Sequence, residues 1–159
     1  MYSVQQDTID LNLAVTQAHF HCEANNEIER ALSLFTEDIV WESPTRGLIL
    51  HGKREVGDNY RRMFCAFEVE GFRCLQRFAT PERVVDDSVL TALIVTDGVK
   101  NAPLPVGSKV EIRLLHVFEM RDGKISRELV FENWKLLEPP LDQVAKAAMQ
   151  KPVRSLQWS

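Results

Sequence analysis

The sequence predicts an α+β fold in which three N-terminal helices pack on one strongly bent antiparallel sheet. Through about the first 67 residues, apolar positions recur with a period near 3.6, which is typical of amphipathic helices. Beyond about residue 70 the period falls to 2, as in strands, and Asp-Gly pairs separate the apolar runs. Helices that precede a series of long antiparallel strands are segregated onto one face of the sheet. A bent sheet closed by helices forms a cone, and its interior is suited to a small ligand.

Helices are expected over residues 7–24, 26–36 and 53–67. The first has apolar residues at i, i+4, i+7 and i+11, namely Leu11, Val15, Ala18 and Cys22. The second begins at Asn26, with Glu29 three residues later, which resembles a capping box. The third has an apolar stripe formed by Val56, Tyr60, Met63, Phe64 and Phe67.

The predicted strands span residues 38–43, 71–79, 83–86, 88–96, 108–121 and 124–136. Turn signals lie at residues 86–88, 97–98 and 122–123, and residues 101–107 form a loop with two prolines. We expect a single domain over residues 1–159 with its core at about 7–137. A short C-terminal helix and a tail occupy residues 141–159, with the tail at 151–159.

Composition excludes several classes of protein. The net charge is −4, from 19 basic and 23 acidic residues, so we expect no nucleic-acid partner. No window approaches the roughly 18 apolar residues of a membrane span, and the polar N-terminus lacks the core of a signal peptide. Three cysteines without motif spacing favour reduced thiols and a cytoplasmic location. The histidines lack metal-ligand spacing and there is no glycine-rich phosphate loop, so no metal and no cofactor is expected.

The predicted strand at 38–43 carries the first candidate binding residues. Neighbouring side chains on a strand point to opposite faces, so Trp41 and Ser43 share one face and Glu42 takes the other. On the inner face, Trp41 is expected to stack on a flat ligand and Ser43 to donate one hydrogen bond. Trp41 is also of a type that simply fills a core.

Several motifs resemble the SnoaL-like branch of the nuclear transport factor 2-like superfamily. They are ALSLFTEDIVWESP, LHGKREV at the start of a helix, and VFEMRDGKISRE on a late hairpin. The stretch LPVGSKVEIRLLHVFEMRDGKI is especially similar to the polyketide-cyclase and ester-cyclase members. The resemblance covers about residues 7–137 and implies a cone-shaped α+β barrel with a hydrophobic pocket, commonly in a dimer. Members include cyclases, isomerases, dehydratases, epoxide hydrolases and non-catalytic binders.

The resemblance also suggests site positions. His116 matches the late-strand histidine of the cyclases, and their acid/base aspartate falls near Val130. His19 falls where the ketosteroid isomerases of this superfamily have a tyrosine, and Ser43 where they have their base aspartate. The aspartates of both groups are therefore missing. Imidazoles titrate near neutral pH and suit proton transfer, although both histidines are equally compatible with a structural role.

The position of Glu128 depends on the register of the hairpin at residues 120–125. A two-residue turn pairs His116 with Leu129. A type I turn with a bulge at Gly123 pairs His116 with Glu128, and the resemblance favours this register. In that case the carboxylate orients the imidazole. Otherwise Glu128 belongs to an exposed charged face.

Two functions follow from these residues. The first is a cofactor-free enzyme that transfers a proton on a small, largely apolar carbonyl compound in an enclosed pocket, leading to cyclisation, isomerisation or dehydration. Its candidate catalytic residues are His116, Glu128 and His19, and its candidate substrate-binding residues are Trp41, Ser43, Tyr60 and Phe64. The alternative is a non-catalytic module that binds a hydrophobic small molecule or a protein partner. In either case apolar side chains on the outer face of the sheet, Leu115 and Val117, predict a homodimer through that face.

Overall fold

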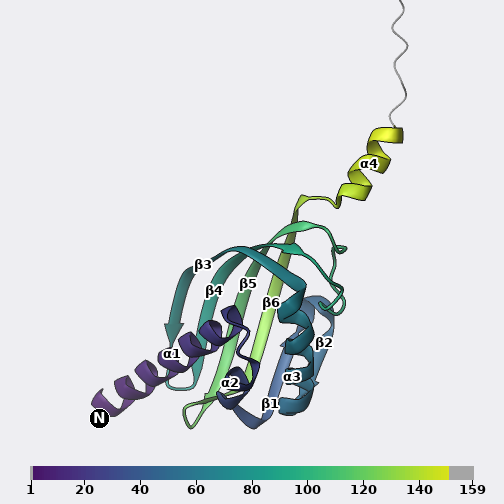
Figure 1. Cartoon of the computed structure of the whole chain (residues 1–159). Coiled ribbons are helices and arrows are strands. Elements are labelled where there is room, and N and C mark those ends of the chain that lie inside the picture. The colour runs from purple at the N-terminus through teal and green to yellow at the C-terminus, as the bar shows by residue number, and fades with distance from the viewer. Residues whose placement is uncertain (1, 151–159) are drawn as a thin grey trace, which may run out of the picture.

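The computed structural model of the protein describes residues 2–150, which form one curved sheet with three helices packed on it and a fourth that projects from it (Figure 1). The helices are α1 (Tyr2–Ala24), α2 (Ile28–Ser33), α3 (Gly52–Met63) and α4 (Leu141–Gln150). The strands are β1 (Phe35–Ser43), β2 (Leu48–His51), β3 (Phe67–Ala79), β4 (Arg83–Ile94), β5 (Lys109–Arg121) and β6 (Lys124–Glu138). Short 3-10 turns occupy η1 (Pro44–Arg46) and η2 (Phe64–Ala66). The predicted α+β class with a bent sheet and helices on one side is confirmed.

The strand order is β2-β1-β6-β5-β4-β3, and the sheet does not close into a barrel. Neighbouring strands are antiparallel except β1 and β6, which run parallel. The sheet is therefore mixed rather than wholly antiparallel, because β1 enters it from α2 rather than through a hairpin with β6. Strand β2 was not predicted, because it is only four residues long (LILH); all four pair with β1.

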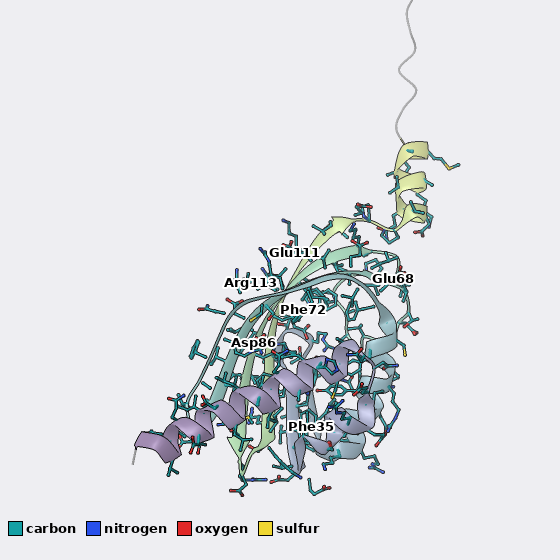
Figure 2. The ribbon with its side chains drawn as sticks, turned by 60° about the vertical axis from the view of Figure 1, so that its left-hand side comes forward. Phe35, Glu68, Phe72, Asp86, Glu111 and Arg113 are labelled. Carbon is teal, nitrogen blue, oxygen red and sulfur yellow. The ribbon has the colours of Figure 1, made fainter. Side chains whose placement is uncertain are left out.

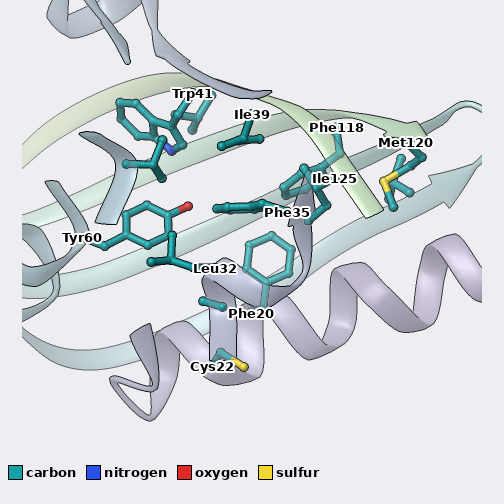
Figure 3. Packing of buried hydrophobic residues seen from close by; sticks show 14 of the residues in the cluster. Phe20, Cys22, Leu32, Phe35, Ile39, Trp41, Tyr60, Phe118, Met120 and Ile125 are labelled. Carbon is teal, nitrogen blue, oxygen red and sulfur yellow. The ribbon is translucent and has the colours of Figure 1, made fainter. Parts of the chain in front are cut away.

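The core lies between the helices and the inner face of the sheet (Figure 3). Its largest fully buried apolar side chains include Trp41, Tyr60, Phe35, Phe118 and Ile39. They come from α3, β1 and β5, so the core joins α3 to the β1 side and the middle of the sheet. Helix α1 adds Phe20 and Cys22 to the same cluster.

The predicted second helix is too long. Asn26 does not cap it but adopts the left-handed conformation (φ 55°), which asparagine tolerates better than most residues. Glu27 precedes the helix instead, without a capping side-chain hydrogen bond. Phe35 already belongs to β1, where it is fully buried. The third helix likewise ends at Met63, and β3 begins at Phe67, four residues earlier than predicted.

The turn predicted at residues 86–88 is wrong, because β4 runs through it without a break. Aspartate disfavours strands, but both carboxylates meet arginines here. Arg77 Nε donates to Asp86 at 2.8 Å, and Arg113 Nε donates to Asp87 at 2.8 Å. Figure 2 shows Asp86 on the side of the sheet that faces α1 and Arg113 on the other side.

The β5–β6 turn has two residues, Asp122 and Gly123, with φ values of 51° and 71°. Arg121 pairs with Lys124, as the first of the two predicted registers requires. The register then shifts, because Ser126 has no partner residue on β5. The bulge therefore lies three residues beyond Gly123, where neither alternative placed it.

The displaced bulge decides where Glu128 points. His116 pairs with Val130, rather than with Leu129 or Glu128, and Glu128 pairs with Phe118. Paired residues of two strands share a face, and so do residues two apart on one strand. Glu128 and His116 consequently lie on the same inner face, as the second register predicted for a different reason.

Helix α4 is confirmed at residues 141–150, but none of its side chains is buried and it projects from the body (Figure 1). The predicted tail at 151–159 lies outside the described residues. Within residues 2–150 no helix combines the length and hydropathy needed to cross a membrane.

Candidate active site

A cavity of about 550 Å³ lies between the inner face of the sheet and the helices. This volume is within the range of pockets that bind small molecules. Its wall is mostly aromatic and apolar, with Phe20, Trp41, Phe64, Phe67, Phe72 and Trp134 among the lining residues. Figure 2 shows Phe72, from β3, on the side of the sheet that faces α1. An apolar compound with flat rings suits such a wall.

Glu128 is a buried carboxylate in the cavity wall, with 2% of its surface exposed. The Tyr60 hydroxyl donates a hydrogen bond to Glu128 Oε2 at 2.7 Å. His19 Nε2 lies 3.5 Å from the same oxygen. Burial alone raises the pKa of a carboxyl, but the charge of His19 outweighs it, so the pKa of Glu128 is lowered. Glu128 is therefore ionised at neutral pH.

His19 is fully buried on α1, and its Nε2 also lies 3.0 Å from Glu23 Oε1. Burial disfavours the charged imidazole, but the charges of Glu23 and Glu128 overcome this and raise the pKa of His19 to about 10. His19 is thus a buried cation at neutral pH. The same surroundings act on Tyr60, where burial and then the charge of Glu128 hold the pKa of the phenol well above its usual value.

His116 lies in the cavity wall between two buried carboxylates. Its Nε2 is 3.8 Å from Glu128 Oε1, and its Nδ1 is 3.9 Å from Asp86 Oδ1. Both distances are too long for hydrogen bonds but short enough for strong electrostatic interaction. The imidazole stacks on Phe118, with ring centroids 5.5 Å apart. This packing fixes the plane of the ring, while Nδ1 is left without a hydrogen-bond partner among the described residues.

Asp86 is fully buried and belongs to a polar network that the sequence did not reveal. Besides the bond from Arg77, it accepts a hydrogen bond from Ser88 Oγ at 2.5 Å. The Cys74 thiol lies 3.4 Å from the second carboxylate oxygen. Burial, followed by the hydrogen bond to Asp86, raises the pKa of that thiol, so Cys74 is not a reactive thiolate.

A second polar cluster surrounds Glu132 at the Trp41 end of the cavity. Arg46 Nε donates to both carboxylate oxygens of Glu132, at 3.1 and 3.0 Å. Ser43 Oγ and Trp134 Nε1 donate to the same carboxylate at 3.1 and 2.8 Å. Ser43 is therefore occupied by Glu132 rather than free to bind a ligand.

The structure brings the predicted site residues together in two layers. Trp41, Phe64, His116 and Glu128 are among the residues that line the cavity, whereas His19, Ser43 and Tyr60 are not. His19 and Tyr60 contact Glu128 from behind the wall. The charged lining residues that were missed include Arg46, Arg77 and Glu132, and buried Asp86, which contacts Arg77, was missed as well. Strand parity does place Glu132 on the face of Glu128, and that was the one available signal.

His19, Glu23 and Glu128 also form a group of potential metal ligands. One nitrogen and two carboxylate oxygens lie within 4.8 Å of one another, and such groups bind divalent cations. The same atoms make the ionic contacts described above, so a cation there would compete with protonated His19 for both carboxylates. The expectation of no metal and no cofactor remains a prediction.

Comparison with known sequences agrees with this architecture. The sequence profile of the SnoaL-like domain matches residues 16–128, which is more than half of the chain. The chain belongs to the SnoaL-like family. No curated protein matches it in sequence.

Solved structures similar to this SnoaL-like chain share its fold at low identity. An LEH-like epoxide hydrolase from M. tuberculosis has a TM-score of 0.62 and 17% identity, over 79% of this chain and 84% of that one. A candidate polyketide cyclase from Xanthomonas campestris pv. campestris has a TM-score of 0.64 and 18% identity, over 79% and 93%. A Mycobacterium tuberculosis protein in complex with estradiol-17β-hemisuccinate has a TM-score of 0.59 and 22% identity, over 76% and 92%. At these identities the likeness establishes the fold alone.

Proposed function

We propose that this protein is a cofactor-free enzyme that moves a proton on a small, largely apolar carbonyl compound. The reaction completed by that step is an isomerisation, cyclisation or dehydration. One observation carries the proposal: the imidazole of His116 is held in the wall of an apolar cavity with a buried carboxylate near each ring nitrogen. Titratable groups that converge in an apolar cavity are typical of acid/base sites.

In the proposed step, His116 Nε2 removes a proton from the carbon beside the carbonyl group. The electron pair of the broken C–H bond moves into the carbonyl, which becomes an enolate. The imidazolium that forms lies between Glu128 and Asp86, and their charges stabilise it. His116 then returns the proton to the same or another carbon, which regenerates the neutral imidazole.

Glu128 acts in this scheme through its charge. Tyr60 and His19 both contact Oε2, which leaves Oε1 toward His116. Ionised Glu128 therefore supports a charge on His116 rather than accepting the substrate proton itself. His19, one of the predicted catalytic residues, is assigned here to keeping Glu128 ionised, because it lies behind the cavity wall.

The similar structures support a small-molecule role in general terms. They include an epoxide hydrolase, a candidate polyketide cyclase and a protein crystallised with a steroid ester. Each of these names implies a small organic ligand, and the cavity described above has the size and apolar wall for one. The reaction type is argued from His116 and its carboxylates rather than from these names.

Hydrogen–deuterium exchange tests the proposal without knowledge of the product. A panel of aryl and steroid ketones is incubated with the protein in D₂O, and loss of the α-proton signal is followed by NMR. We expect catalysed exchange of at least one ketone, slowed about a hundred- to ten-thousandfold by His116→Ala. Binding of the ketones without exchange above the buffer rate would support the binding module instead.

A further inference from the structure

Arg46 is a buried cation in the cavity wall that the proposed reaction does not use. Only 2% of its side chain is exposed, and its guanidinium lies 5.3 Å from the centre of the Trp41 ring. Gly47 follows it in the left-handed conformation (φ 63°), which ends the short turn η1 and lets the chain enter β2. A buried guanidinium needs acceptors for its N–H groups.

The donors of Arg46 are only partly satisfied. Nε donates to Glu132, and Nη1 donates to the carbonyl of Lys100 at 3.0 Å. Nη2 has only the thioether of Met63, at 3.8 Å, and sulfur is a weak acceptor. Within residues 2–150, Nη2 therefore has no oxygen partner, and both Arg46 and Met63 line the cavity.

We propose that Nη2 of Arg46 binds a neutral oxygen acceptor of the ligand, such as a ketone or ester carbonyl, at the Trp41 end of the cavity. A neutral oxygen is favoured because Glu132 already balances the charge of Arg46. The inference rests on the proposed function and adds a second oxygen to its substrate class. His116 is paired with Val130, and Val130 and Glu132 lie two residues apart on one face of β6, which is about 7 Å along a strand. The oxygen bound by Arg46 is thus separate from the carbon at His116, and the ligand is long enough to reach both.

Arg77 is the matched comparison. It also lines the cavity, stacks over a ring (Phe20, 5.0 Å) and pairs with a buried carboxylate, Asp86. Its Nη1 is engaged by Gln17 Oε1 at 2.6 Å, and 15% of its side chain is exposed to water. Water can therefore satisfy its remaining donors, whereas the more deeply buried side chain of Arg46 has little contact with bulk water.

Two isosteric ligands measure the proposed contact directly. In 2-acetyl-6-isopropylnaphthalene a methyl group replaces one carbonyl oxygen of 2,6-diacetylnaphthalene, and the dissociation constants of both compounds are determined by calorimetry. We expect the wild type to prefer the diketone about tenfold to a hundredfold, as for a hydrogen bond from a charged donor. Arg46→Lys keeps the charge beside Glu132 but loses the planar fork, so the preference should fall to about one.

The controls separate this inference from the proposed reaction. Arg77→Lys should leave the preference unchanged, and so should His116→Ala, even though the latter slows α-proton exchange about a hundredfold or more. Unchanged affinity for the isopropyl compound shows that the cavity of Arg46→Lys is intact, and Arg46→Gln replaces that variant if it does not fold. Equal affinity of the wild type for both ligands would overturn the inference, as would a loss of preference in Arg77→Lys alone.

Discussion

His19 is the side chain whose chemistry is most altered by its surroundings. It is a buried imidazole between two carboxylates, and its pKa is raised from the ordinary 6.5 to about 10. Since the folded protein holds this proton more tightly than the unfolded chain, the proton stabilises the fold. That stabilisation is fully present below pH 6.5 and is lost as the pH rises through about 10.

The first prediction concerns the pH dependence of stability. Between about pH 6.5 and 10, His19 should make the free energy of unfolding fall by up to about 1.4 kcal/mol per pH unit. His19→Gln cannot titrate, so its stability should be lower at pH 6.5 and nearly flat over this interval. Urea unfolding at a series of pH values gives both curves. Parallel curves would mean that His19 is neutral in the folded protein.

The second prediction concerns Tyr60. Tyr60→Phe keeps the ring that stacks on Phe64 but removes the hydrogen bond to buried Glu128. We expect a loss of about 1–3 kcal/mol in the free energy of unfolding. Because that bond also helps to lower the pKa of Glu128, the midpoint of acid unfolding should move to higher pH. An unchanged acid midpoint would show that Tyr60 does not support the ionised form of Glu128.

At the residue scale, simple periodicity located much of the candidate site. Strand parity placed Trp41 inward, and the apolar stripe of the third helix contained Tyr60. Arg46 and Asp86 could not be found in this way, because their burial depends on partners distant in sequence. Arg46 needs Glu132, which is 86 positions away, and Asp86 needs Arg77 on the neighbouring strand. Local secondary-structure propensity places such residues on the surface or in turns.

At the scale of elements, tertiary contacts explain the features that were predicted incorrectly from the sequence. The bulge at Ser126 is not marked by glycine, and it occurs where β6 also meets β1 as a parallel neighbour. Phe35 and Ile125 are paired at that junction, and both are fully buried. The β5–β6 register is therefore set by the burial of side chains on both β1 and β6. The turn residues alone do not set it.

The third prediction tests the packing of the β4–β5 connection on α3. A Cβ added at Gly98 would lie 2.2 Å from the carbonyl oxygen of Arg62, which is backbone and cannot rotate away. We expect Gly98→Ala to reduce the free energy of unfolding by about 1–3 kcal/mol. Gly71→Ala is the control, since a Cβ there meets nothing within 4 Å. Equal denaturant midpoints for the two variants would contradict this packing.

At the scale of the whole molecule, the outer face of the sheet carries exposed apolar side chains. Leu115 and Phe131 are paired across β5 and β6 and are 38% and 45% exposed. Phe78 adds a third large side chain on the same face at 55% exposure. Such a face favours association, so the homodimer expected from the sequence remains our proposal for the assembly.

The fourth prediction tests that assembly. Leu115→Lys places a charge in the centre of the apolar face and should convert the proposed dimer to a monomer at micromolar concentration. Val4→Lys changes another exposed apolar residue, 70% accessible on α1, and should leave the mass unchanged. Light scattering measures both. A monomeric wild type would contradict the proposed homodimer. A Leu115→Lys variant that is still dimeric would show that the dimer interface is not the outer face of the sheet.

A structure with bound ligand tests the proposed function most directly, because it shows whether the cavity holds a carbonyl compound beside His116. With 2,6-diacetylnaphthalene we predict the rings between the aromatic walls. An α-carbon should lie about 3–3.5 Å from His116 Nε2, and the other carbonyl should accept a hydrogen bond from Arg46. A ligand bound only on the outer face of the sheet, or in the cavity with both carbonyls turned away from His116, would contradict the proposed function.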